Sequence, residues 1–524
     1  MTPAMENADI IIRGGTIIDG TGRPGYRGDI AVKDGIIAAL GDLQRLRGRR
    51  EFSAEGLAVA PGFIDAHAHS DTMFVRDDSG ASKLYQGITT EISGNCGDSP
   101  FPMRKGDSDP WMFPSFEEFL DAFSRRGCRM AVNQAMLTGH GTLRDAVIGE
   151  ANRAATPAEM EEMKRLLRRD MEAGTLGLSL GLEYAPGCFA NQAELNELGK
   201  TVREMEGIVT CHMRSEGLQI DSAIQELAEI GRASGAHVHA SHLKLDNYTV
   251  HGRAPQVWEA IEQANREGIR FTADTYPYTA SSTTLSIRCP RWSMDGGREG
   301  LLRCLRGPRR QEIVEGIRRH YFNAERAETC LFSDDRGTWP EIVGKTLRQV
   351  AEDMLHTTDY AEAAAEVLLR TEAKAWCVFF VMSEEDMLYF LSRDICIGSD
   401  GYALPGEAAQ MHYNPHPRSY GAVAEFFRLA REKRICGVEE AVRRVTGKPA
   451  DIFGLTDRGR LEAGLAADIT VFDPAAFAPR ATYLQPVQLA RGVRLVIVNG
   501  TVALRDGRQT EERAGKLLRK ELKR

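Results

Sequence analysis

The sequence has no long hydrophobic run. No apolar stretch reaches the roughly 18 residues that a membrane-spanning helix needs. The N-terminal stretch "MTPAMENADIIIRGG" also lacks the basic segment followed by a long apolar one that marks a signal peptide. We therefore expect a cytoplasmic protein without a membrane partner.

Net positive charge and closely spaced cysteines are missing as well. The 66 Lys and Arg residues are outnumbered by 74 Asp and Glu residues, and the formal charge of -8 argues against a nucleic-acid partner. The 10 cysteines have neither disulfide-scaffold nor C-x-x-C spacing, so we expect most to be buried thiols. With 42% hydrophobic and 27% charged residues, the composition is that of a globular protein; it favours small-molecule chemistry and allows a homo-oligomer.

Both ends of the chain carry short β-runs. "ADIIIRGGTIIDGTG" near the start and "GRLEAGLAADITVFDP" near the end combine apolar runs with glycine-containing turns. One β-domain built from residues 1–60 and 455–524 would explain the likeness, and two separate β-domains would too. The 524 residues exceed the usual size of a single domain, which leaves room for another unit between these ends.

Eight apolar runs between residues 61 and 454 each end in polar residues before a helix-like stretch. This is the count of a TIM-like (β/α)8 barrel, an α/β fold that carries its chemistry at the carboxyl ends of the strands. One helix-like stretch starts with Thr156 and Glu159 at the spacing of a capping box. Residues 283–377 fit no single loop and helix, and their helical pattern predicts an inserted subdomain over the barrel mouth.

Metal-ligating residue types gather at the predicted strand ends. In "PGFIDAHAHS", alternation along the strand turns His67 and His69 to the same side. The ends of four other predicted strands carry Cys96, His212, His242 and Asp400. A packed thiol, hydrogen-bonded core imidazoles or a helix N-cap would explain each of these residues alone. Six of them at matching strand ends predict a metal site.

Three other histidines compete for these roles. His237 and His239 precede His242 in one strand, and the odd step to His242 requires a bulge or the end of the strand to bring it to the mouth. The place of His242 before Lys244 and the loop favours it as the ligand. His140 also follows a predicted strand and is a candidate for lining the substrate pocket.

The order of the motifs adds information beyond the single residues. After the H-x-H pair come "GNCG", "CHMRSEG", "SHLK", "DTYPYTA", "GSDG" and "HPRSYG". In this order the chain resembles the amidohydrolase superfamily over nearly its whole length, and within it the D-aminoacylase (N-acyl-D-amino-acid deacylase) group. The resemblance implies a barrel with a small β-sandwich from both chain ends, and hydrolysis of N-acyl-D-amino acids to a carboxylic acid and a free D-amino acid.

The candidate ligands depart from those of other superfamily branches. Hydantoinases and dihydroorotases resemble each other in bridging two metals with a carboxylated lysine on strand four, but "TLGLSLGLEYAPG" offers only Glu183 as a charged residue. Cys96 is the natural replacement, because a thiolate near a metal is deprotonated and can bind it. The resemblance implies tightly held zinc on Cys96, His212 and His242. It implies a second, weaker position surrounded by His67, His69 and Asp400.

The predicted site contains the groups that amide hydrolysis requires. An open zinc position would lower the pKa of a bound water to about 7, giving a hydroxide able to attack an amide carbonyl. Asp400 is the candidate to move the proton from that water to the leaving nitrogen. Cations would hold the α-carboxylate of the amino acid, and hydroxyl groups would assist them. The predicted substrate-binding residues are Lys244, Tyr276, Ser282, Arg418 and Tyr184.

Two other interpretations of the site stay open. One is another amidohydrolase reaction, either cyclic amide hydrolysis of the dihydroorotase or hydantoinase kind, or deamination. The other is a non-catalytic barrel with a partial metal site. The presence of Asp400 argues against the second, because a binding relic has little use for a proton shuttle.

Overall fold

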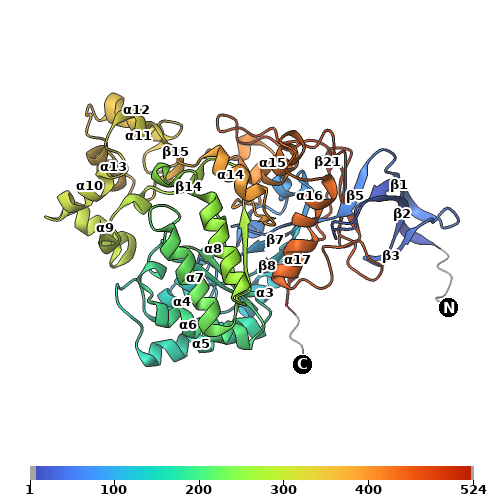
Figure 1. Cartoon of the computed structure of the whole chain (residues 1–524), viewed down its shortest axis with the longest axis horizontal. Coiled ribbons are helices and arrows are strands. Elements are labelled where there is room, and N and C mark those ends of the chain that lie inside the picture. The colour runs from blue at the N-terminus through green and yellow to red at the C-terminus, as the bar shows by residue number, and fades with distance from the viewer. Residues whose placement is uncertain (1–6, 412, 521–524) are drawn as a thin grey trace.

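The computed structural model describes residues 7–411 and 413–520 of the chain. Figure 1 shows N-terminal strands at one end of the molecule, a group of helices from the insertion at the other end, and further strands with their helices between them. No helix in this described part of the chain has the length and hydropathy needed to cross a membrane.

Segments from both ends of the chain form one mixed sheet. Its order is β21-β20-β19-β18-β5-β1-β2-β3, with β4 paired to β1. The antiparallel pairing of β5 (Ala58–Pro61) with β18 (Ile469–Phe472) joins the N-terminal strands to the C-terminal ones. Ile10 and Ile497 pack in its buried core. The other strands are β1 (Ala8–Ile17), β2 (Tyr26–Lys33), β3 (Ile36–Gly41), β4 (Gly48–Ser53), β19 (Val493–Val498), β20 (Thr501–Arg505) and β21 (Arg508–Gln509).

Parallel strands occupy the middle of the molecule in two sheets, of order β22-β8-β7-β6 and β17-β13-β12-β11-β10-β9. Only Leu137 separates β8 from β9. The β6 edge of one sheet and the β17 edge of the other are connected just beyond the ends of these strands. There Ala68 forms a β-bridge with Gly401, and the Asp400 amide donates to the His67 carbonyl over 2.8 Å. The strands are β6 (Phe63–Asp65), β7 (Ile88–Ser93), β8 (Asn133–Met136), β9 (Thr138–Gly139), β10 (Gly177–Gly181), β11 (Ile208–His212), β12 (His237–Ala240), β13 (Phe271–Thr275) and β17 (Cys396–Ile397). Each of the eight apolar runs expected from the sequence contains one of these strands, with β8 and β9 in the same run.

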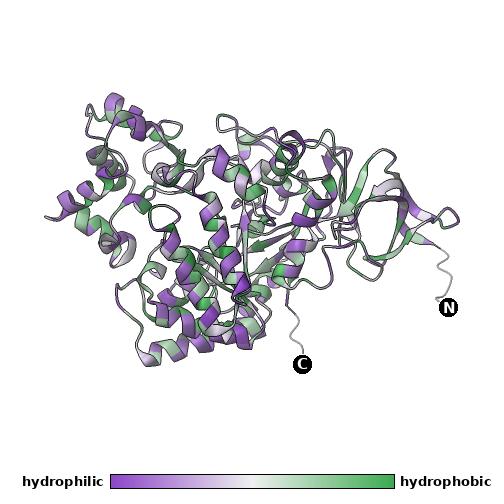
Figure 2. Cartoon of the chain, in the orientation of Figure 1, coloured by the Kyte–Doolittle hydropathy of each residue, from purple (hydrophilic) through white to green (hydrophobic). Residues whose placement is uncertain are grey.

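Amphipathic helices connect these strands. α5 (Pro157–Glu172) begins at the expected capping box, in which the Glu159 amide donates to the Thr156 hydroxyl and the Glu159 carboxylate accepts from the Thr156 amide. Figure 2 shows hydrophilic and hydrophobic residues alternating along the helices, as one face of each is buried. The other helices outside the insertion are α1 (Met73–Arg76), α2 (Ala81–Leu84), α3 (Phe116–Arg125), α4 (His140–Val147), α6 (Gln192–Glu204), α7 (Ile220–Ser234), α8 (Ala254–Arg266), α14 (Glu384–Leu391), α15 (Arg418–Glu432), α16 (Val438–Arg444) and α17 (Gly447–Phe453).

The insertion has a hydrophobic core of its own, which includes Leu301 and Phe332. Its antiparallel sheet, of order β14-β16-β15, extends from β14 (Ser281–Thr284) to β16 (Trp376–Phe379), so it exceeds the predicted range of 283–377 by two residues at each end. Because β14 follows soon after β13, the insertion starts at the carboxyl end of a parallel strand. Its other elements are α9 (Gly297–Arg306), α10 (Arg310–Arg318), α11 (Ala324–Glu328), β15 (Cys330–Asp334), α12 (Leu347–Gln349) and α13 (Tyr360–Arg370).

The last described residues of the chain are not part of the mixed sheet that contains β1 and β18. β22 (Leu517–Leu518) pairs in parallel with β8, and the Lys520 amide donates to the Gly174 carbonyl over 2.9 Å. The segment around β22 was expected to belong to the β-domain of residues 1–60 and 455–524. In the structure it instead makes its hydrogen bonds with β8 and with the Gly174 carbonyl. Residues 1–6 and 521–524 of that expected domain lie outside the described residues.

Candidate active site and metal centre

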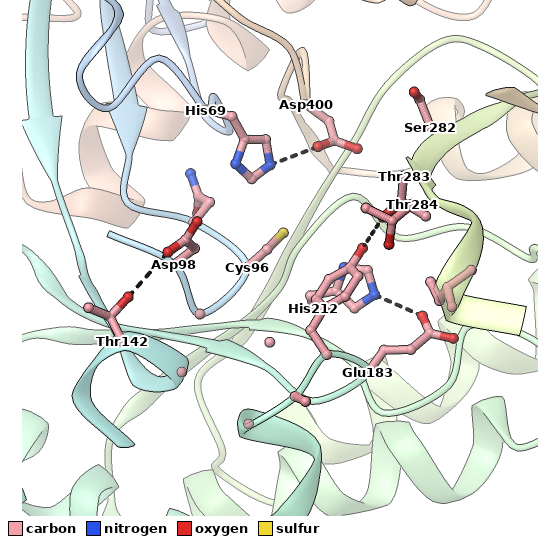
Figure 3. A pocket seen from close by; sticks show the side chains of 18 of the residues that line it. His69, Cys96, Asp98, Thr142, Glu183, His212, Ser282, Thr283, Thr284 and Asp400 are labelled. Atoms are coloured by element: carbon pink, nitrogen blue, oxygen red, sulfur yellow. Dashed lines mark hydrogen bonds and ion pairs between the residues drawn. The ribbon is translucent and has the colours of Figure 1, made fainter. Parts of the chain in front are cut away.

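A cavity of about 620 Å³ lies at the carboxyl ends of the parallel strands. Figure 3 shows Cys96 in it, with Asp98 on one side and Ser282 on the other. Its lining includes nine of the candidate residues, namely His69, Cys96, Tyr184, His212, His242, Lys244, Ser282, Asp400 and Arg418. The other two, His67 and Tyr276, are buried behind the lining, with relative exposures of 0% and 1%.

Three of the candidate residues have a left-handed backbone. The angle φ is 54° at Cys96, 37° at His242 and 50° at Asp400. A non-glycine residue in this region costs of order 1–2 kcal/mol, and such residues gather at functional sites where the surrounding structure enforces them. β12 ends at Ala240, and the turn that follows brings the His242 imidazole to the cavity.

The competing histidines are not part of the cavity lining, although His239 Nε2 lies 2.8 Å from Asp274 Oδ2, the oxygen that also faces His67. His237 and His239 both contact the Thr272 hydroxyl, at 2.7 and 2.8 Å. His140 is fully buried, and its Nε2 lies 2.8 Å from Glu194 Oε1. His140, a candidate for lining the substrate pocket, is therefore not part of the cavity lining, and its side chain connects α4 with α6 instead.

Thiol and imidazole groups converge beside the cavity. His242 Nε2 lies 3.2 Å from Cys96 Sγ and 3.0 Å from His212 Nδ1, and His67 Nε2 lies 3.4 Å from Cys96 Sγ. Since one sulfur with several imidazoles is a ligand set of zinc, these donors fit a divalent cation. Three sets have all their donor atoms within 4.8 Å of one another: His67 with Cys96 and His242, His67 with His69 and Asp400, and His212 with Glu216 and His242. These sets share His67 and His242. The expected set of His67, His69 and Asp400 is one of them, whereas Cys96, His212 and His242 are divided between the other two.

The outer nitrogen of three imidazoles faces a carboxylate. The pairs are His212 Nε2 with Glu183 Oε2 at 2.9 Å, His242 Nδ1 with Glu216 Oε1 at 2.9 Å, and His67 Nδ1 with Asp274 Oδ2 at 3.5 Å. Such carboxylates fix the tautomer and the orientation of a ligand histidine. None of these three carboxylates was predicted from the sequence as a site residue. A signal was present, because Glu216 stands in "CHMRSEG" and Asp274 in "DTYPYTA".

Burial controls the protonation of the donor groups. It lowers the pKa of His212 to about 4, and together with the Lys244 ammonium it lowers the pKa of His242 well below its ordinary value. Burial and the Asp400 carboxylate raise the pKa of the Cys96 thiol. The imidazoles of His212 and His242 are therefore neutral, as metal ligands must be, and the Cys96 thiol needs a nearby cation to ionise.

Asp400 is held from two sides. Its Oδ1 lies 3.0 Å from His69 Nε2, and its Oδ2 lies 2.7 Å from Arg418 Nη1. The contact with Arg418 is an ion pair in which the N–H group is not aligned for a hydrogen bond. Burial raises the pKa of Asp400, but the groups around its carboxylate, the Arg418 guanidinium foremost, outweigh burial and hold this pKa well below its ordinary value. Asp400 is therefore an ionised carboxylate held in a fixed position.

The two candidate cations for the substrate are buried and already paired. Lys244 Nζ lies 2.5 Å from Glu216 Oε2, and Arg418 contacts Asp400. The Tyr276 ring lies 5.7 Å from Lys244 Nζ and 5.0 Å from the Arg418 guanidinium carbon. The Tyr276 hydroxyl donates to Met382 Sδ over 3.9 Å. Tyr276 thus contacts the two cations with its ring, whereas its hydroxyl was predicted from the sequence to face the substrate.

Two candidate hydroxyl groups lie where the insertion meets the cavity. The Tyr184 hydroxyl is 3.1 Å from Thr283 Oγ1, and Ser282 Oγ accepts from Trp376 Nε1 over 2.9 Å. Both Tyr184 and Ser282 line the cavity. The start and the end of the insertion therefore form part of the wall of the site.

Comparisons with known proteins match the chain over nearly its full length. A family model described as "Amidohydrolase family" matches residues 50–285 and 396–504. The chain is 33% identical to an N-acyl-D-aspartate deacylase of Alcaligenes xylosoxydans xylosoxydans, covering 98% of this chain and 96% of the relative. It is also 33% identical to a D-aminoacylase of that organism, covering 97% of each. A solved N-acyl-D-glutamate deacylase of Bordetella bronchiseptica, complexed with zinc and a phosphonate inhibitor, matches with a TM-score of 0.82 and 34% identity, over 98% of this chain and 100% of that one.

Proposed function

We propose a function from the premise that the chain belongs to the amidohydrolase family and, within it, to the D-aminoacylase group. The protein is a hydrolase that cleaves the amide bond of N-acyl-D-amino acids and releases a carboxylic acid and a free D-amino acid. The observation that carries this proposal is one cavity that combines a thiol–imidazole cluster, an ionised Asp400 and two buried cations.

The donor groups hold a divalent metal, for which we propose zinc. Cys96, His212 and His242 would form a tight position, and His67, His69 and Asp400 would surround a second, weaker one. This assignment is supported by the short distances from His242 Nε2 to Cys96 Sγ and to His212 Nδ1, by the contact of His69 with Asp400, and by the affinity of zinc for sulfur and imidazole. When bound, such a cation polarises a carbonyl oxygen and makes water a better nucleophile at neutral pH.

Asp400 is the group that moves the proton. As a carboxylate it accepts a proton from the water that attacks the amide carbonyl, and it then donates this proton to the nitrogen as the C–N bond breaks. An amide nitrogen leaves poorly without this proton. His69 and Arg418 hold the two carboxylate oxygens in place throughout.

Lys244 and Arg418 bind the α-carboxylate of the substrate. Arg418 offers several N–H donors, and both Arg418 and Lys244 line the cavity near the Tyr276 ring. The hydroxyl groups of Ser282 and Tyr184 are the neutral donors on that side. With the carboxylate and the scissile carbonyl both held, one hand of the stereocentre places its side chain in the remaining space, and from the family we propose that this hand is D.

We further propose that the parallel strands close into a (β/α)8 barrel and that the sheet of the chain ends is a small β-sandwich. The bridge between Ala68 and Gly401 and the continuous segment of β8 and β9 support closure at the two edges where the parallel sheets meet. The catalytic cavity would then lie at the barrel mouth, beneath the insertion.

A panel of N-acetyl-D- and N-acetyl-L-amino acids tests the function. We expect the D series to be cleaved far faster. Esterifying the α-carboxylate should lower kcat/KM by about 1.5–3 kcal/mol, the worth of a charge-assisted hydrogen bond. Arg418→Met should erase most of the difference between acid and ester while the metal stays bound. Equal turnover of both enantiomers, or turnover of hydantoins or adenine alone, would contradict the proposal.

A further inference from the structure

A lysine side chain is completely buried behind the catalytic cavity. Lys83 belongs to α2, between β6 and β7, and it is not part of the cavity lining. Its Nζ lies 2.6 Å from Asp65 Oδ2 and 3.3 Å from Glu91 Oε2. The two carboxylates are on paired positions of β6 and β7, and all three residues have 0% relative exposure. Because buried charges are costly unless they are paired, the ammonium and the two carboxylates depend on one another.

The Asp65 carboxylate connects this buried lysine to the backbone around Asp400. Asp65 Oδ1 accepts hydrogen bonds from the Ser399 amide over 2.7 Å and from the His67 amide over 3.3 Å. Asp65 Oδ2 accepts from the Ser399 hydroxyl over 2.5 Å, and the hydroxyl oxygen in turn accepts from the Gly401 amide over 3.1 Å. The residues on both sides of Asp400 are therefore held by groups that bind the lysine.

The Glu91 carboxylate provides a second connection to the same segment. Glu91 Oε2 accepts from the Ser70 hydroxyl over 2.8 Å, and Ser70 Oγ accepts from the Ala403 amide over 2.7 Å. Ser70 directly follows His69 in the sequence. Both connections start at Lys83, which among residues 7–411 and 413–520 is the one cation within 4.0 Å of either carboxylate.

The backbone of Asp400 needs such support. Its φ of 50° lies in the left-handed region, which a residue with a side chain adopts only where the surrounding structure enforces it. Figure 3 shows the Asp400 carboxylate facing His69 at the cavity. A proton carrier must stay within hydrogen-bond reach of the groups that it serves, so a shift of this backbone would move the carboxylate away from the reacting atoms.

We propose, resting on the hydrolase function proposed above, that Lys83 is a positioning residue for proton transfer by Asp400. The ammonium holds the Asp65 and Glu91 carboxylates, and these hold the backbone that gives Asp400 its conformation. Without the ammonium the two carboxylates repel each other, and the segment that they hold shifts. The transfer step is then slower, whereas the groups that bind the substrate are unchanged.

Lys83→Met tests this proposal in the metal-loaded full chain. We expect kcat to fall by about tenfold or more with little change in KM and in zinc content. Arg458→Met is the matched control, because it breaks another buried ion pair, with Asp468, at relative exposures of 4% and 3%. It should lower the stability in a similar way but leave kcat unchanged. An unchanged kcat in Lys83→Met, or loss of its zinc, would overturn the proposal.

A kinetic cycle distinguishes positioning of Asp400 from a general structural role. In an Asp400→Asn background the proton transfer is already lost, so adding Lys83→Met should lower kcat no further. A residue that only supports the fold would lower kcat by the same factor in both backgrounds. That result would contradict the assignment of Lys83 to this step.

Hydrogen exchange tests the same connection without turnover. In Lys83→Met the Ser399, Gly401 and Ala403 amides should exchange about tenfold faster or more, whereas the amides of β11 should not change. Unchanged exchange at these three amides would refute the positioning role. Absence of hydrolysis by the natural protein would count against the hydrolase function instead. If Lys83→Met does not fold, Ser399→Ala replaces it in all three measurements, because it removes only the hydroxyl that accepts from the Gly401 amide and from the Lys83 ammonium.

Discussion

Asp400→Asn is the substitution for which the structure makes the sharpest prediction. The amide has nearly the same shape as the carboxylate but cannot carry the proton, so kcat should fall by about a hundredfold or more, equivalent to about 2.7 kcal/mol. The substitution should also lower stability, because it leaves the guanidinium of Arg418 without its counter-charge at 4% relative exposure. Removing one partner of a buried ion pair costs about 3–5 kcal/mol. We expect the lower end here, since Arg418 keeps its contacts with the Ser282 carbonyl and the Tyr276 ring.

A double-mutant cycle separates the two effects. Arg418→Met alone leaves the Asp400 charge unpaired, and Asp400→Asn with Arg418→Met removes both charges. The loss of unfolding free energy in the double variant should therefore be smaller than the sum of the two single losses, by about 2 kcal/mol or more. The kcat of the double variant should stay low. Urea unfolding of metal-free protein measures the stability, and steady-state kinetics with metal analysis measures the rate. An Asp400→Asn protein that keeps its kcat would refute the proton transfer, and one that loses its metal would make Asp400 a metal ligand first. Additive changes in the free energy of unfolding would refute the ion pair.

Three further predictions concern the metal and the pH dependence of stability. Dialysed protein should retain about one zinc equivalent, which Cys96→Ala should lose together with most activity; full activity with magnesium alone would contradict this. Glu183→Gln should weaken metal affinity by about 10–100-fold in chelator competition, because Glu183 orients His212; unchanged affinity would remove that role. Burial raises the pKa of Asp170 from 3.8 to about 6, so the folded protein binds this proton more tightly, and stability should fall by up to about 3 kcal/mol as pH rises from about 4 to 6. Asp170→Asn keeps an acceptor for the Phe116 amide and should lose this fall in urea unfolding; an unchanged slope would exclude Asp170 as its source.

Features that depend on neighbouring residues could be predicted from the sequence. The capping box of α5 needs only Thr156 and Glu159, three residues apart, and both of its hydrogen bonds are present. His67 and His69 are placed at the end of a strand by alternation alone. Polar residues at the carboxyl ends of neighbouring parallel strands are expected to lie together. In agreement, Cys96 Sγ lies 3.4 Å from His67 Nε2, although the two residues are 29 positions apart in the sequence.

Features that depend on distant pairing could not be predicted in the same way. Which carboxylate faces His212 depends on how two strands lie against each other, so Glu183 was visible but had no role. Tyr276 follows a strand in a quoted motif, yet its hydroxyl donates to Met382, a residue 106 positions later in the sequence. The limits of the insertion were missed by two residues at each end because β14 and β16 are defined by pairing with each other.

The pairing of β22 with β8 has a consequence for how the protein is made. The Lys516 amide donates to Asn133 Oδ1 across 383 residues of sequence, next to this pairing. A ribosome adds about 5–20 residues each second, so β22 is synthesised tens of seconds after β8, and the edge of β8 stays unpaired during that time. During that time the nascent chain presents an unpaired strand edge, which is the kind of surface that chaperones cover and that aggregates recruit. Yield in a host should therefore respond to chaperone level and to translation speed more than to the stability of the finished molecule.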